Sequence, residues 1–306
     1  MQAKRAPVCA ATHIGATAAA RLVGRRQFVL HTTRPARRKL YAGQNYRSNT
    51  MWNSVNRLDG SKIAATDGEI GHIKEVYFDD HAWVVRYLVI DTGSWIAGRE
   101  VLVSPYSVQQ PLGSGKIIEV SLTRQQVEDS PVIDTQLPVS HQHERDFLRY
   151  YTYPEYWSGG DLWGASGLPL LTPPFTAPLG EKENQPVRDE EVKAQNHRLR
   201  SSDAVTGYDI QAADDSIGHV KDFIFDDESW AIRYLVVDTH NWWPGGKKVL
   251  LATRWIERID WVARTVHTTL TREQVKNSPE YDENAAMSRD YEKKLHAAYD
   301  REGYWD

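Results

Sequence analysis

The chain has one cysteine, Cys9, among 306 residues, and no run of uncharged apolar residues as long as a membrane-spanning helix requires. A single cysteine excludes a disulfide framework and a zinc site built from cysteines. The sequence also lacks a Walker loop, a Gly-x-Ser-x-Gly motif, a His-Glu-x-x-His motif and a dinucleotide fingerprint. We therefore expect no enzymatic activity, no cofactor, no metal site and no membrane span.

Acidic residues are missing from residues 1–50, which carry ten basic residues. This composition is typical of an organelle-targeting peptide or a basic arm, and a mis-assigned start before Met51 is a third interpretation. We expect no stable fold there. Residues 51–306 hold the other 27 basic residues and all 41 acidic ones, a net charge of −14. Such an acidic body argues against direct binding of nucleic acid.

An internal repeat dominates the remainder of the sequence. Gly71–Thr92 and Gly218–Thr239 are identical at 13 of 22 positions, at a spacing of 147 residues. The correspondence extends to Tyr156-Trp157 and Tyr304-Trp305, at a spacing of 148. A repeat of this length indicates a duplicated structural module.

Three segments follow from the repeat. The first module spans residues 51–157 and the second spans 199–306, with a linker rich in proline and glycine at 158–198. We expect this linker to lie over one module through three apolar side chains, Trp163, Leu170 and Phe175.

Within each module the pattern predicts short strands. Ile70–Phe78 and Ala82–Asp91 are rich in valine, isoleucine and aromatic residues, and Asp79-Asp80-His81 is typical of the turn between them. In the second strand Trp83, Val85, Tyr87 and Val89 are expected to share one face. Further strands are expected at 100–103 and 116–122.

Helices are predicted after the strands of each module. Thr123 with Gln126 forms a capping box at the start of one helix, and Thr271 occupies the same position in the second module. A second amphipathic helix is expected at Ser140–Tyr151 and again at Ser288–Tyr299. Short strands at even spacing predict a mainly β fold made of small barrels.

The repeated pattern carries a family resemblance. It reads Gly-x-aliphatic-x-(Asp/Glu)-x-x-Phe-Asp-Asp-x-x-Trp-x-aliphatic-Arg-Tyr-Leu-Val-aliphatic-Asp-Thr, and it resembles the PRC-barrel family. The resemblance implies two small PRC-type β-barrels in tandem, each followed by short helices. It also implies two roles, because the family is named for the cytoplasmic domain of the photosynthetic reaction centre H subunit, and a related barrel forms part of a ribosome maturation factor.

Three tryptophans are the candidate partner-binding residues. Trp95 and the pair Trp242-Trp243 lie in turns of the form Asp-Thr-x-x-Trp-x-x-Gly, where large rings are uncommon. Such rings either form an exposed anchor for a partner or pack back on their own module. Both interpretations stay open from the sequence.

Charged residues inside apolar strands are expected to be structural. We expect ion pairs between Arg86 and Asp91 and between Arg233 and Asp238, because a buried arginine requires a polar partner. The aspartates of the hairpin turns are expected to cap backbone N–H groups. These turn residues are Asp79, Asp80, Asp226 and Asp227.

The sequence therefore favours a non-enzymatic protein-binding or assembly module. The resemblance adds two alternatives, an accessory of photosynthetic or quinone-linked electron transfer and a factor associated with the ribosome or RNA processing. We expect a cytoplasmic location, with peripheral membrane association left open, and an unidentified protein partner. The two modules are expected to pair with each other within one chain, because like modules pair about a twofold axis.

Overall fold

The computed structural model describes residues 52–96, 98–109, 112, 116–132, 139, 141–157, 159–171 and 199–305. The expected leader, 1–50, lies outside the described residues, as does the part of the linker at 172–198 that contains Phe175. Both modules belong to one compact unit.

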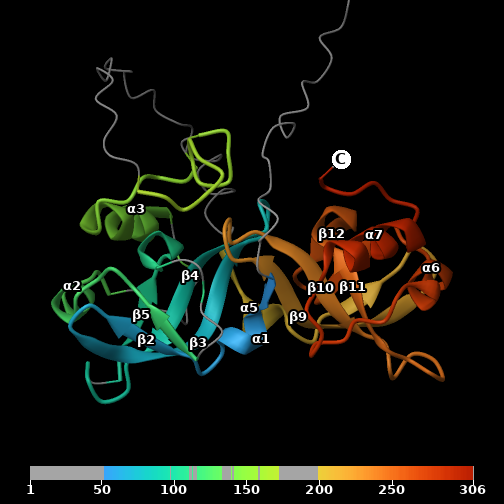
Figure 1. Cartoon of the computed structure of the whole chain (residues 1–306), viewed down its shortest axis with the longest axis horizontal. Helices are drawn as coiled ribbons and strands as arrows, with labels where there is room; N and C mark the ends of the chain where they lie inside the picture. Colours follow the sequence, from blue (N-terminus) through green and yellow to red (C-terminus); the bar gives the residue numbers. More distant parts are fainter. Residues whose placement is uncertain are drawn as a thin grey trace, which may run out of the picture. The chain divides into compact units, whose positions relative to one another are not determined.

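The first module forms a sheet in the order β5–β4–β3–β2–β6 (Figure 1). Its strands are β2 (Lys62–Ala65), β3 (Gly68–Asp79), β4 (Val84–Asp91), β5 (Glu100–Val103) and β6 (Ile117–Glu119). Neighbouring strands are antiparallel except β2 and β6, which are parallel. The strands predicted from the sequence are present, although β4 begins two residues later than expected and β6 is shorter than the expected 116–122. Every residue of β4 from Val84 to Ile90 is buried, which explains why this strand is apolar on both faces apart from Arg86.

The second module repeats this sheet in the order β11–β10–β9–β8–β13–β12 (Figure 1). Its strands are β8 (Asp209–Gln211), β9 (Ser216–Asp226), β10 (Ile232–Asp238), β11 (Lys248–Ala252), β12 (Ile256–Asp260) and β13 (Thr265–Thr268). A 3₁₀ turn precedes the last strands of both modules, η1 (Pro105–Ser107) in the first and η2 (Thr253–Trp255) in the second. The fold is mainly β, with two sheets and a few short helices.

A glycine opens the repeated segment because two strands approach each other closely there. At Gly71 a Cβ atom would lie 2.1 Å from the carbonyl oxygen of Asp91, and at Gly218 it would lie 2.3 Å from that of Asp238. The β3 register shifts beside Gly71, and the β9 register shifts beside Gly218. Only glycine fits this approach in either module.

The helices begin where the capping pattern predicts. In α2 (Arg124–Glu128) the Thr123 hydroxyl accepts the Gln126 N–H, and the Gln126 side chain accepts the Thr123 N–H at 2.8 Å. Thr271 and Gln274 form the same box at α6 (Arg272–Asn277). The second predicted helix of each module is also present, as α3 (His141–Tyr150) and α7 (Arg289–Ala298).

The modules exchange their first strands. β1 (Trp52–Ser54) precedes the first sheet but pairs with β9 of the second, and β7 (Leu199–Ser201) precedes the second sheet but pairs with β3 of the first. The helices that follow are α1 (Val55–Leu58) and α5 (Ser202–Val205), and Figure 1 shows α5 beside β3 and α1 beside β9. The expected pairing of the modules within one chain is confirmed in this form.

Trp83 does not belong to the strand in which the sequence placed it. β4 begins at Val84, and Trp83 has a φ of 54°, in the left-handed region that a bulky residue rarely occupies. Trp230 has the same conformation in the second module, with a φ of 58°. In this conformation the backbone carbonyls of both tryptophans point toward the other module. The Trp83 carbonyl accepts the N–H of Ile232 at 2.7 Å, and the Trp230 carbonyl accepts the N–H of Val85 at 2.9 Å.

The beginning of the linker packs against both modules. The Trp163 side chain is buried, and its Nε1–H donates to the Ser229 carbonyl of the second module at 2.8 Å. Its ring also meets the Tyr106 ring of the first module edge-on, with centroids 5.0 Å apart. Leu170 was wrongly expected to pack here: its side chain is 55% exposed, although the neighbouring Pro169 is buried.

Candidate functional site

The three tryptophans proposed as partner contacts all pack against their own modules. Trp95 is half-buried, with the Arg124 guanidinium 4.4 Å from its ring centre. Trp242 donates its Nε1–H to the Ser216 hydroxyl at 2.8 Å, and its ring packs against the ring of His219. Trp243 is 9% exposed. The sequence left open whether these rings are exposed or packed. In the structure all three tryptophan rings pack against their own module.

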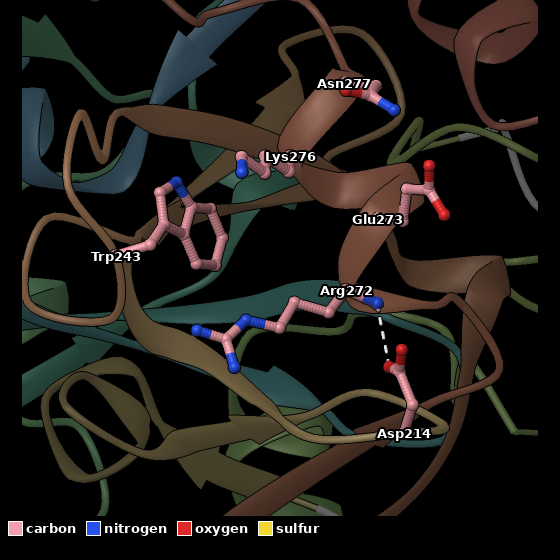
Figure 2. A pocket seen from close by; sticks show the side chains of 6 residues that line it. All are labelled: Asp214, Trp243, Arg272, Glu273, Lys276 and Asn277. Carbon is pink, nitrogen blue, oxygen red and sulfur yellow. Dashed lines mark hydrogen bonds between the residues drawn. The ribbon is translucent and has the colours of Figure 1, made fainter.

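Trp243 nevertheless reaches the surface as one wall of a pocket of about 480 Å³ (Figure 2). Trp243 comes from the turn between β10 and β11, and Asp214 comes from the turn between β8 and β9. Helix α6 contributes the remaining lining residues, which are Arg272, Glu273, Lys276 and Asn277. Three separate segments therefore converge on this pocket.

Cationic groups lie next to the indole inside the pocket. Figure 2 shows the Arg272 guanidinium and the Lys276 amine on the side of Trp243, whereas Glu273 points away from it. Arg272 is held in place, because it donates to the Trp242 carbonyl at 2.9 Å and pairs with Asp215. Asp214 accepts the backbone N–H of Arg272 at 2.8 Å. The Lys276 side chain is exposed at the rim.

The first module lacks the same lining, although its backbone is alike. Arg124 repeats Arg272, and its N–H donates to Asp67 at 2.7 Å as Arg272 donates to Asp214. The repeat spacing, however, places Ile96 where the second module has Trp243, and Glu128 where it has Lys276. The first module has one indole here, Trp95 beside Arg124. The second indole, Trp243, and the exposed cation Lys276 therefore distinguish the second module from the first.

The expected Arg–Asp ion pairs are corrected by the structure. Arg86 pairs with Asp79 at 3.5 Å instead of Asp91, and Arg233 pairs with Asp226 at 3.0 Å instead of Asp238. Residues five apart on a strand point to opposite faces, so neither arginine can reach the aspartate at the end of its own strand. The strand-end aspartates contact histidines: Asp91 lies 3.7 Å from His72, and Asp238 lies 2.7 Å from His240.

The first aspartate of each hairpin turn caps backbone N–H groups as expected, whereas such a cap is not seen for Asp80. Asp79 accepts the N–H groups of His81 and Ala82, both at 2.9 Å, and Asp226 accepts that of Ser229 at 2.6 Å. The turns are buried, since Asp79, Asp226 and Asp227 are at most 6% exposed. Asp80 instead pairs with Arg200 of the second module at 2.8 Å. Burial raises the pKa of Asp80, and Arg200 partly opposes this rise.

A buried carboxyl flanked by two tyrosines was missed by the sequence reasoning. Glu144 of α3 is 2% exposed, and its Oε1 accepts the hydroxyls of Tyr156 at 2.6 Å and Tyr87 at 3.1 Å. The Arg86 guanidinium lies 3.8 Å from the centre of the Tyr156 ring. Burial raises the pKa of the Glu144 carboxyl to about 7, although both hydroxyls and Arg86 favour its charged form.

The second module repeats this cluster. Glu292 of α7 accepts the hydroxyls of Tyr234 at 2.8 Å and Tyr304 at 2.9 Å, and Arg289 lies 2.9 Å from its other oxygen. Burial raises the pKa of Glu292. Each cluster joins the last helix of its module and the following segment to one strand of the sheet, β4 in the first module and β10 in the second. One signal could have found both clusters: the glutamate and both tyrosines recur at the repeat spacing.

Neither a membrane-spanning helix nor a cluster of metal ligands occurs among the residues that the structure describes. None of the helices that the structure describes is long and apolar enough to cross a membrane. Within the same part of the chain, histidine, cysteine, aspartate and glutamate side chains form no group of three or more that could hold a metal ion.

Comparison with known proteins gives one family match, found twice. The profile of the PRC-barrel domain matches residues 53–125 and residues 200–275. These two regions contain the two sheets described above. No curated protein matches the chain significantly.

Proposed function

Because this chain is a tandem PRC-barrel protein, we propose that it is a non-enzymatic module that binds a protein partner through the pocket at Trp243. The observation that carries this proposal is the difference between the copies. The second module joins an indole wall, a fixed guanidinium and an exposed amine in one pocket, and the first module has Ile96 and Glu128 at the corresponding places. Aromatic and arginine side chains in a pocket are typical of the centre of protein interfaces.

The chemistry of the pocket favours an acidic side chain on the partner. Arg272 is already paired with Asp215, so its guanidinium contributes mainly by shaping the pocket and by its position beside the indole. Lys276 supplies the charge that a partner meets on approach. A carboxylate reaching Lys276 would form a charge-assisted hydrogen bond at the edge of an apolar surface.

Lys276→Glu tests this proposal with little risk to the fold, because Lys276 is exposed and surface substitutions rarely change stability by more than about 0.5 kcal/mol. We expect the variant to lose its partner, with affinity reduced about tenfold or more, because a like charge then faces the carboxylate. The measurement is affinity capture of the tagged chain from native lysate, from soluble and detergent-extracted membrane fractions in parallel, followed by quantitative mass spectrometry.

Lys116→Glu is the matched control, since Lys116 is an exposed lysine of the first module and the charge change is identical. Equal capture by Lys276→Glu and the unaltered chain would exclude the pocket as the partner contact. The captured proteins also separate the alternatives: membrane redox components would favour an electron-transfer accessory, and ribosomal proteins would favour a ribosome-associated factor.

A further inference from the structure

The backbone pairing between the modules is reciprocal. Trp52 lies opposite Asp226 and Ser54 opposite Ile224, and in the other direction Leu199 lies opposite Asp79 and Ser201 opposite Tyr77. Each position on one side is matched by the position 147 residues away on the other. Both sheets therefore receive an edge strand from the neighbouring module in the same register.

Side chains repeat the reciprocity. Ser54 donates its hydroxyl hydrogen bond to the Asp222 carboxylate, and Ser201 donates to the Glu75 carboxylate. Glu75 and Asp222 occupy equivalent positions of the repeat, as do Ser54 and Ser201. In both directions, therefore, a serine of the exchanged strand (β1 or β7) donates a hydrogen bond to a carboxylate of the other module's sheet.

The centre of this interface is buried and apolar. Phe78 and Phe223 are at most 1% exposed, and their ring centroids lie 5.4 Å apart. Val84 and Ala231 form an antiparallel bridge between the sheets, next to the paired Trp83 and Trp230 carbonyl contacts. The modules are joined by short backbone pairings in both directions and by a common core, as two subunits are joined in a homodimer interface.

We propose that each module is a binding site for the first strand of a second module and that this recognition does not require the covalent connection. The open edges of β3 and β9 would otherwise present unpaired N–H and C=O groups, which are templates for another strand. The partner that fits is a second copy of the module with its own strand exposed. In the intact chain the linker raises the effective concentration of the modules to roughly the millimolar range. The open edges are therefore paired within one chain and not between chains.

One ion pair makes the recognition asymmetric. Arg200 of β7 lies 2.8 Å from Asp80 of the first module, and its guanidinium also lies 3.9 Å from the centre of the Trp261 ring. The equivalent residues of the reverse contact are Asn53 and Asp227, which cannot form an ion pair. The first module should therefore prefer the second module to another copy of itself.

The test uses the full chain with a protease site inserted between residues 185 and 186. After folding and purification the chain is cut, and we expect the two pieces to migrate together as a 1:1 complex at micromolar concentration. Cut protein tagged on the first piece is then mixed with untagged cut protein, and the tag is captured. We expect the tagged first piece to retain a second piece from the untagged preparation, while uncut chains show no exchange.

Arg200→Ala in the cut protein should weaken the complex about tenfold without dissociating it fully, because the backbone pairing remains. Three outcomes overturn the proposal: separation of the pieces after cutting, precipitation of either piece, or failure of the tag to retain an untagged second piece. Retention of untagged first pieces in equal amount would overturn the preference for the unlike module.

Discussion

Replacing Trp230 by alanine should lower the free energy of unfolding by about 3–5 kcal/mol, the range for removing a large aromatic side chain from a core. Trp230 is 0% exposed, and its ring stacks on Phe225 with centroids 5.2 Å apart and planes 20° apart. The surrounding strands are hydrogen-bonded on both sides, so they cannot close over the resulting cavity. Equilibrium urea denaturation followed by tryptophan fluorescence and circular dichroism measures the loss.

Two further variants separate packing from polarity at this position. Trp230→Phe should cost much less than Trp230→Ala, because it keeps a stacked ring and removes the Nε1–H, which is buried without a hydrogen-bond partner. Trp83→Ala should also cost less, since the equivalent Trp83 is half-buried. A loss below about 1 kcal/mol for Trp230→Ala would contradict the packing role assigned to this ring.

Glu144→Gln should stabilise the protein progressively as the pH rises. Burial raises the pKa of Glu144 to about 7 from the ordinary 4.5, so the folded chain keeps a proton that the unfolded chain releases. Folding stability from this group is therefore fully present below pH 4.5 and is lost as the pH rises to 7. Glutamine carries no charge at any of these pH values and still accepts both tyrosine hydroxyls. The variant therefore does not lose folding stability at this position as the pH rises.

The expected difference is large enough to measure. Between pH 5 and pH 8 the variant should gain roughly 2–3 kcal/mol relative to the unaltered chain, since each pKa unit is worth about 1.4 kcal/mol. Glu292→Gln is the internal comparison: it should shift stability in the same direction by less, because Arg289 lies 2.9 Å from the Glu292 carboxylate and favours its charge. Parallel stability curves for Glu144→Gln and the unaltered chain would show that the carboxyl is charged when buried.

The sequence predicted those features that depend on neighbouring residues. The β3–β4 hairpin, its aspartate caps and the capping box of Thr123 with Gln126 follow from patterns only a few residues long. The partners predicted for Arg86 and Arg233 were wrong, because an aspartate five residues further along a strand points to the opposite face. Strand parity alone would have corrected both.

Features that join distant segments could not be predicted in the same way. Trp52–Ser54 is three residues long, too short to show alternation, and its partner strand is more than 160 residues away. The role of Glu144 was hidden because a glutamate in a polar helix normally faces solvent. The candidate pocket was predicted only in part. The sequence singled out Trp243, but it did not indicate Lys276, because this lysine comes close to Trp243 only when α6 packs beside the turn.

The strand exchange has a consequence for synthesis. β3 leaves the ribosome about 120 residues before β7, the strand that completes its edge, and translation proceeds at roughly 5–20 residues per second. The nascent first module therefore waits roughly 6–24 s with one edge uncovered, and β1 waits longer still for β9. During that interval the nascent chains on one mRNA carry matching open edges close together. We expect early termination, or closely spaced ribosomes, to allow strand pairing between chains and hence aggregation.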